Sequence, residues 1–134
     1  MKRVATVVVT RTGPDYAQSI ATGGFEFLSD EPVSAGGRNA GPAPYGLVLA
    51  GLGSCTAITL KMYADRKGWD IGTLQVSLTL EKDADGNSHI ARMLSTDAAL
   101  DDAQWDKLIE IAGKTPVTKT LQAGATITAA RART

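Results

Sequence analysis

The stretch PYGLVLAGLGSCTAITLKMYADRK, residues 44–67, decides the fold of this chain. Apolar or small residues occupy every face of the expected helix before Lys61. Pro44 suits its first turn, where a missing N–H breaks no intrahelical bond. We therefore predict one long helix from Pro44 to Lys67, ended by Gly68. A helix that is apolar on all sides must be surrounded by protein, so the sequence predicts a long buried helix at the centre of the molecule.

Interior glycines distinguish this helix from an ordinary apolar one. Each costs about 1 kcal/mol of helix stability relative to alanine, so their presence indicates a packing reason. Gly46, Ala50, Gly53 and Ala57 recur at spacings of four, three and four residues. This small-residue stripe predicts the close approach of another helix or a strand.

The residues around the helix show strand and turn patterns that predict an α+β fold. Three short antiparallel strands are expected before the helix, at residues 4–10, 16–22 and 25–28. After the helix, the apolar alternation at residues 73–81 and 88–96 flanks the turn pair Asp85-Gly86. That arrangement predicts a β-hairpin.

Two shorter helices and a last strand complete the predicted fold. Asp101 is a helix cap with Gln104 at the third helical position, a capping-box pattern, and Gly113 ends that helix. Residues 115–122, which open on a Thr-Pro pair, form the second helix, and residues 125–130 form the last strand. The predicted order is β-β-β-α-β-β-α-α-β, with antiparallel sheets around the long central helix.

Length, charge and cysteine content narrow the classes of protein open to the chain. Its 134 residues predict a single domain, 1–134, large enough to hold its own core. Fourteen basic and fourteen acidic residues give no net charge, which argues against nucleic-acid and anionic-membrane partners. The uncharged run 41–60 could span a bilayer by length, but its prolines and small polar residues favour a buried helix. One cysteine allows no intramolecular disulfide, so we predict a cytoplasmic protein.

Cys55 is the candidate reactive residue. A single histidine, His89, leaves no ligand set for a metal cluster, and no phosphate-binding loop is present, so we predict neither metal nor cofactor. A lone cysteine on an apolar helix can be an inert small hydrophobe. A reactive one needs a nearby cation to hold it as thiolate. Arg38, in the Gly- and Pro-rich loop before the helix, is the candidate cation.

Three stretches of the chain resemble the OsmC/Ohr family. Residues 37–57, which hold Cys55, are similar to the family's first motif, and residues 63–69 are similar to its OsmC-like subgroup. Residues 115–121, TPVTKTL, resemble the second motif. The predicted order of elements agrees with the fold of that family. The resemblance implies an intertwined homodimer with the long helices at its centre and two sites at the subunit interface.

The resemblance also implies an activity, because active members are thiol peroxidases that reduce small organic hydroperoxides in oxidative stress. It places Cys55 at the peroxidatic position and Arg38 near the arginine that holds the thiolate. Thr115 stands where a resolving cysteine is expected, and Tyr45 and Gly46 stand where an acidic residue is expected. Threonine cannot form a disulfide, so the family's two-cysteine cycle is not available to this chain.

Three hypotheses about function remain open at this point. The first is a one-cysteine peroxidase, in which an external thiol reductant resolves the sulfenic acid formed on Cys55. The second is a non-peroxidase homodimer whose pocket binds a small apolar ligand, which the replacements at Thr115 and Gly46 favour. The third is a structural or partner-binding dimer.

Overall fold

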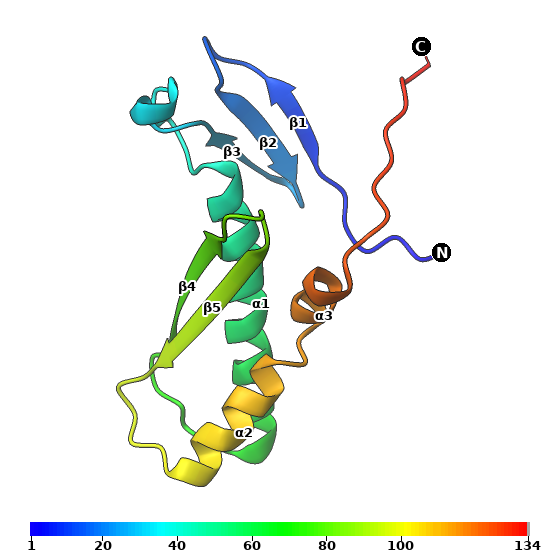
Figure 1. The fold of residues 1–134 in the computed structure, drawn as a ribbon. Helices are drawn as coiled ribbons and strands as arrows, with labels where there is room; N and C mark the ends of the chain where they lie inside the picture. The colour runs from blue at the N-terminus through cyan, green and yellow to red at the C-terminus, as the bar shows by residue number, and fades with distance from the viewer. Residues whose placement is uncertain (134) are drawn as a thin grey trace. The chain divides into compact units, whose positions relative to one another are not determined.

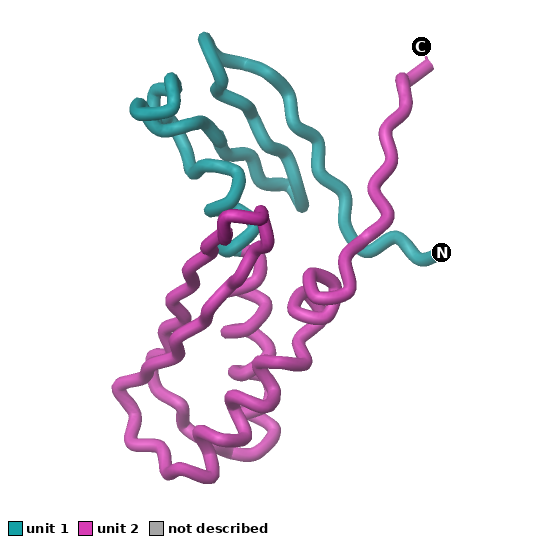
Figure 2. The backbone as a smooth tube through the Cα atoms, in the orientation of Figure 1, with its two compact units in different colours: residues 1–50 teal, residues 51–134 magenta. Residues whose placement is uncertain are grey.

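The computed structural model describes residues 1–133 and arranges the chain in two compact units, Met1–Ala50 and Gly51–Thr134 (Figure 2). Helix α1 continues from the first unit into the second. The elements in chain order are β1 (Val8–Arg11), β2 (Gln18–Thr22), β3 (Phe25–Ser29), a short 3-10 turn (Val33–Ala35), α1 (Pro44–Lys67), β4 (Gln75–Lys82), β5 (Ser88–Ser95), α2 (Asp102–Ala112) and α3 (Pro116–Ala123) (Figure 1). The predicted α+β class with antiparallel sheets is confirmed.

The first unit is built on a three-stranded antiparallel sheet in the order β1-β2-β3. Ile20, at the middle of β2, is buried. All three predicted strands exist, but β1 begins at Val8 instead of residue 4, and β2 begins at Gln18 instead of residue 16. The later start of β2 has a local cause, because Asp15 adopts φ 61°, a left-handed conformation that turns the chain.

Helix α1 has the predicted bounds, and its C-terminal end has the predicted geometry. Gly68 adopts φ 69°, and the N–H of Trp69 donates to the carbonyl oxygen of Ala64 at 2.9 Å. Such a left-handed glycine satisfies carbonyl groups that the helix end leaves without partners. The ring of Trp69 then packs edge-on to Tyr63, with ring centroids 5.6 Å apart.

Within the single chain, α1 is buried on one face and not on every side. Its buried residues follow one face of the helix: Leu52, Gly53, Thr56, Leu60 and Ala64. Apolar side chains elsewhere on α1 are exposed, by 53% at Ile58 and 58% at Met62. By length and hydropathy α1 could cross a membrane, a test that core helices of soluble proteins also pass. The apolar residues of α1 indicate how much of the helix surface is suited to burial. The rest of the single chain buries one face of it only.

The second unit packs the β4–β5 hairpin and α2 against α1 (Figure 1). Leu60 and Leu108 are wholly buried at the centre of its core. The predicted capping box is confirmed, because the side chain of Asp101 accepts from the N–H of Gln104, and the Gln104 side chain accepts from the N–H of Asp101. Both strands of the hairpin and both short helices lie within two residues of their predicted bounds.

The last predicted strand, residues 125–130, is the clearest error in the predicted fold. Helix α3 ends at Ala123, and residues 124–133 form neither helix nor strand. In Figure 1 they run on from α3 as an extended segment. A strand exists only where a neighbour completes its backbone hydrogen bonds, and no strand among residues 1–133 pairs with this segment. The β-branched residues indicate that the segment favours an extended conformation. They do not show whether another strand is present to pair with it.

Candidate thiol site

Cys55, the only cysteine in the sequence, lies near the middle of α1 and is half-buried. Within residues 1–133, no cluster of histidine, cysteine, aspartate or glutamate side chains could hold a metal ion. His89 is exposed, as expected for a residue at the start of a hairpin strand. Chemistry at this helix would therefore rest on the thiol and on the polar groups around its turn of α1.

The next residue, Thr56, is wholly buried on the inner face of α1. Its hydroxyl donates to the carbonyl oxygen of Leu52, one turn earlier, at 2.7 Å. The hydroxyl oxygen of Thr56 also accepts a 3.0 Å hydrogen bond from Nη1 of Arg92. Burying a hydroxyl is unfavourable unless it is hydrogen-bonded. Thr56 both donates and accepts, so the network satisfies it.

Arg92 reaches this helix from strand β5, whose residues alternate between exposed and half-buried. It occupies the half-buried side together with Ile90 and Leu94, and it lies opposite Leu78 in the register of the hairpin. Leu78 packs directly on Gly53, where an added Cβ would lie 2.7 Å from Leu78 Cδ1. The predicted close approach of a strand to the small-residue stripe is confirmed at this glycine, and it brings Arg92 within reach of α1.

The second sequence motif, residues 115–121, is hydrogen-bonded to the same guanidinium of Arg92. Nη1 of Arg92 donates to the hydroxyl oxygen of Thr118 at 2.8 Å. The hydroxyl of Thr118 donates to the carbonyl oxygen of Ala112 at 3.2 Å, and it lies 2.7 Å from the hydroxyl of Thr115. Because the Thr118 proton is directed to Ala112, the Thr115 hydroxyl is the donor in the last contact. Thr115 is also the N-cap of α3, where it accepts from the N–H of Thr118.

We call these four side chains, Thr56, Arg92, Thr115 and Thr118, the hydroxyl network. It joins the residue beside Cys55 to Thr115, which stands at the expected resolving position and is wholly buried. The two motifs that the sequence pairs only by resemblance are thus linked by hydrogen bonds through one guanidinium.

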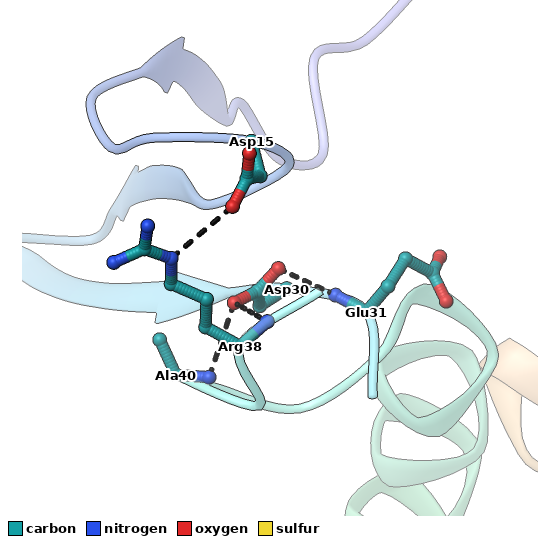
Figure 3. A network of polar contacts seen from close by, with 5 residues as sticks. All are labelled: Asp15, Asp30, Glu31, Arg38 and Ala40. Carbon is teal, nitrogen blue, oxygen red and sulfur yellow. Dashed lines mark hydrogen bonds and ion pairs between the residues drawn. The ribbon is translucent and has the colours of Figure 1, made fainter. Parts of the chain in front are cut away.

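Arg38, the cation predicted to serve Cys55, belongs to a different network in the first unit (Figure 3). Its Nε donates to Oδ2 of Asp15 at 3.1 Å, in a pair whose side chains are 64% and 50% exposed. The backbone N–H groups of Arg38 and Ala40 donate to Oδ2 of Asp30, and the N–H of Glu31 donates to Oδ1 (Figure 3). In the described contacts Arg38 closes the loop that leads to α1.

Asp30 anchors that loop from a buried position, with only 3% of its surface exposed. Burial opposes its ionisation and is the largest single influence, but hydrogen bonds from the backbone of Ala40, Glu31 and Arg38 together outweigh it, so the pKa of Asp30 lies below its usual value. At Gly37 an added Cβ would collide with the carbonyl oxygen of Glu31. Gly37 is therefore needed for the close approach of the loop to the segment that directly follows β3.

The structure assigns the two predicted site residues, Cys55 and Arg38, to different units, and their partnership stays a prediction. Gly46, at the expected acidic position, is exposed, and apart from its chain neighbours and the backbone of α1 itself, no described atom lies within 4 Å of an added Cβ there. Arg92 was missed by the sequence reasoning. A signal was available, because an arginine between Ile90 and Leu94 on the apolar side of an alternating strand must have polar partners.

A half-buried cysteine on a long helix, in a chain that also forms two antiparallel sheets, defines an α+β protein with one candidate thiol. A family model described as OsmC-like protein matches residues 36–130, which is more than half of the chain. The chain belongs to the OsmC-like protein family, and the resemblance predicted from its motifs is confirmed.

Solved structures of related proteins have the same fold. The organic hydroperoxide resistance protein OhrB of Bacillus subtilis is 26% identical, with a TM-score of 0.60 over 90% of this chain and 91% of that one. A proposed osmotic stress induced and detoxification response protein of Psychrobacter arcticus is 25% identical, with a TM-score of 0.73 over 90% of each chain. An OsmC like protein of Mycoplasma pneumoniae is 19% identical, with a TM-score of 0.71 over 91% and 89%. No curated protein matches the chain.

Proposed function

We propose that the chain reduces organic hydroperoxides as a one-cysteine thiol peroxidase, in cytoplasmic defence against oxidative stress. The observation that carries this proposal is the half-buried position of Cys55, the only thiol, on the helix that the family model covers. The name of the Bacillus subtilis relative, organic hydroperoxide resistance protein, supports the same class of substrate. No metal or cofactor is required for this chemistry.

The proposed reaction begins with attack by the Cys55 thiolate on one peroxide oxygen. A sulfur–oxygen bond forms, the oxygen–oxygen bond breaks, and the leaving alkoxide takes a proton to become an alcohol. Cys55 is then a sulfenic acid. Because Thr115 cannot resolve it, an external thiol attacks the sulfenic sulfur and releases water, and a second thiol reduces the mixed disulfide. One hydroperoxide and two thiols thus yield one alcohol, one water and one disulfide.

We also propose that the active form is a homodimer. The apolar surface of α1 supports this, because Val48, Ile58 and Met62 are all more than 40% exposed in the single chain. Exposed apolar side chains gathered on one element mark an interaction surface. Sedimentation velocity should give a particle of twice the chain mass, and Ile58→Glu should shift it toward the monomer. A wild-type monomer at micromolar concentration would overturn this part of the proposal.

Stopped-flow kinetics with the reduced protein and cumene hydroperoxide test the peroxidase. We expect consumption of the hydroperoxide well above the rate of a free thiol, and formation of one sulfenic acid per chain, trapped with dimedone. Cys55→Ser should abolish both signals. Ser54→Ala is the matched control, because the Ser54 hydroxyl makes only a long 3.5 Å contact with the carbonyl oxygen of Gly51. Wild-type protein no faster than a free thiol would overturn the proposal.

A second candidate function, binding of a small apolar ligand without peroxide chemistry, has an observation of its own. A mostly apolar hollow of about 460 Å³ lies beside α1, lined by Ala57, Ile58, Lys61, Met62, Ile71, Gly72 and Leu74. That volume is within the usual range of small-molecule sites. Native mass spectrometry of the purified protein would show a bound small molecule under this alternative. Protein without any bound molecule, together with peroxidase turnover, would eliminate it.

A further inference from the structure

Arg92 differs from three lysines of the second unit, Lys61, Lys107 and Lys114, in the kind of partner that it has. Lys61 pairs with Asp65, and Lys107 and Lys114 both pair with Glu110. Those pairs are exposed or half-exposed, and each brings a carboxylate to its cation. Arg92 is held by two threonine hydroxyls, which carry no charge.

The hydrogen bonds of the guanidinium can be counted atom by atom. An arginine carries five N–H donors, two on each terminal nitrogen and one on Nε. The two on Nη1 are used by Thr56 and Thr118. Neither Nε nor Nη2 has an acceptor among residues 1–133, and no aspartate or glutamate of that range pairs with Arg92. Three donors and one full positive charge are therefore left over.

The neighbouring hydroxyls cannot take up that charge, because their own bonds are already complete. Thr56 directs its proton to the carbonyl oxygen of Leu52. Thr118 directs its proton to Ala112 and accepts from both Arg92 and Thr115. The network fixes the direction of the guanidinium without neutralising it. The Nε–Nη2 edge, which binds carboxylates through two parallel hydrogen bonds, stays open.

The guanidinium is held at the turn of α1 that carries the thiol, because Arg92 donates to Thr56, the residue directly after Cys55. The half-buried side of β5 adds apolar surface from Ile90 and Leu94 on either side of the charge. A monovalent carboxylate on a short apolar body matches one guanidinium in such surroundings, whereas a phosphate dianion would exceed its charge.

We propose that Arg92 is a specificity-determining residue that binds the carboxylate of the substrate, so that the protein prefers hydroperoxides carrying a carboxylate over neutral ones. This inference rests on the proposed function for its kinetic consequence, but the binding itself requires no reaction at Cys55. Arg92 contacts the anionic end of the ligand, while the peroxide reacts at the thiol. Thr56, Thr115 and Thr118 hold the guanidinium in place.

The kinetic experiment compares one medium-chain hydroperoxide bearing a terminal carboxylate with its own methyl ester. The acid is fully ionised at pH 7, whereas the ester has no charge. We expect wild-type kcat/KM to favour the acid by about tenfold or more, chiefly through KM. Arg92→Met should bring the ratio to about one, and Arg92→Lys, which keeps the charge but not the fork, should give an intermediate ratio. Arg66→Met, at an exposed site on α1, is the matched control and should keep the wild-type ratio.

The ratio of acid to ester is informative because general damage to the fold lowers both rates together. Equal kcat/KM values for the two compounds in wild-type protein would overturn the inference and leave the peroxidase intact, whatever the variants do. A preference that survives Arg92→Met would also overturn it. If neither compound reacts, the proposed peroxidase function is wrong. The role of Arg92 in binding a carboxylate is then tested by the binding experiment alone.

The binding experiment uses the unreactive hydroxy acid that corresponds to the reduced substrate, with its methyl ester as control. Isothermal titration of the Cys55→Ser protein should show the acid binding at least about tenfold more tightly than the ester. Adding Arg92→Lys to that protein should remove most of the difference. Equal affinities for acid and ester would mean that solvent or another chain meets the open edge, and the inference would be overturned.

Discussion

Two arginines, Arg38 in the first motif and Arg92 on β5, are held in opposite ways. Arg38 is exposed, lies in a loop and pairs with a carboxylate, Asp15. Arg92 is half-buried, lies on a strand and is bonded to the hydroxyls of Thr56 and Thr118. The first has its charge compensated by the protein, and the second does not. A half-buried charge without a carboxylate partner in the described residues is the better candidate for a binding site, because burial of an unpaired charge is unfavourable.

The same contrast holds for the two networks as wholes. In the first unit the buried acceptor is a carboxylate, Asp30, and its donors are backbone N–H groups of the Gly-rich loop. In the hydroxyl network every acceptor is neutral, and the charge is carried by one donor, the guanidinium of Arg92. The first arrangement is complete within the described loop and serves folding. The second has three N–H donors to spare and can serve a ligand.

The largest effect on stability is expected from the first network. Asp30→Ala removes the acceptor of three part-buried backbone N–H groups at once. We expect a larger fall in the urea midpoint than from any single hydroxyl of the second network. Circular dichroism against urea at pH 7 measures it. A midpoint equal to that of wild type would mean that the loop does not depend on this carboxylate.

The pH dependence of the same residue has a definite sign. The folded-state pKa of Asp30 is lowered, so its contribution is present above the unfolded pKa of about 3.9 and is lost as the pH falls through the lower folded value. Wild type should therefore lose part of its stability below about pH 4. Asp30→Asn should lack that part of the pH dependence. Identical pH profiles for the two proteins would contradict the expectation.

The next effect concerns the hydroxyl network. Thr118→Val keeps the shape of the side chain but removes an acceptor from Arg92 and a partner from Thr115, so we expect a loss of about 1–3 kcal/mol in the free energy of unfolding. Thr120→Val, at an exposed position of the same helix, should change it by less than about 0.5 kcal/mol. Equal losses in the two variants would show that helix propensity, and not the network, sets the effect.

A smaller effect tests the close approach that brings Arg92 to α1. In Gly51→Ala the new Cβ meets no described atom within 4 Å apart from its chain neighbours and the backbone of α1 itself, so the variant should gain about 1 kcal/mol from helix propensity. Gly53→Ala has the same gain but pushes on the Leu78 side chain, so it should be about 1–2 kcal/mol less stable than Gly51→Ala. Urea unfolding of both variants gives the difference. A difference near zero would mean that Leu78 moves aside freely.

The smallest effect is expected at Arg38. Its ion pair with Asp15 is exposed on both sides, and such pairs contribute less than about 1 kcal/mol. Arg38→Ala should leave the urea midpoint nearly unchanged and should keep the preference for the acid over its ester. A loss of that preference in Arg38→Ala would break the contrast between the two arginines and return Arg38 to the site.

Much of the fold could be predicted from local chemistry. Pro44 at the first turn and Gly68 just after the last set the bounds of α1, and the pair Asp101 and Gln104 set the start of α2. The site was less predictable. Cys55 and Thr115 were found from motifs, but Arg92 is separated from Thr56 by 36 positions and from Thr118 by 26, and no local pattern joins them.

The sequence by itself determined the long helix, the hairpin, the caps and the single thiol, because each of these depends on residues within a few positions of one another. Only the tertiary structure decided which face of α1 is covered, whether residues 125–130 have a strand to pair with, and which arginine is bonded to the turn that follows Cys55. These depend on contacts between distant segments. Composition and spacing indicate which segments require burial or hydrogen-bond partners. Three-dimensional packing determines which other segments provide them.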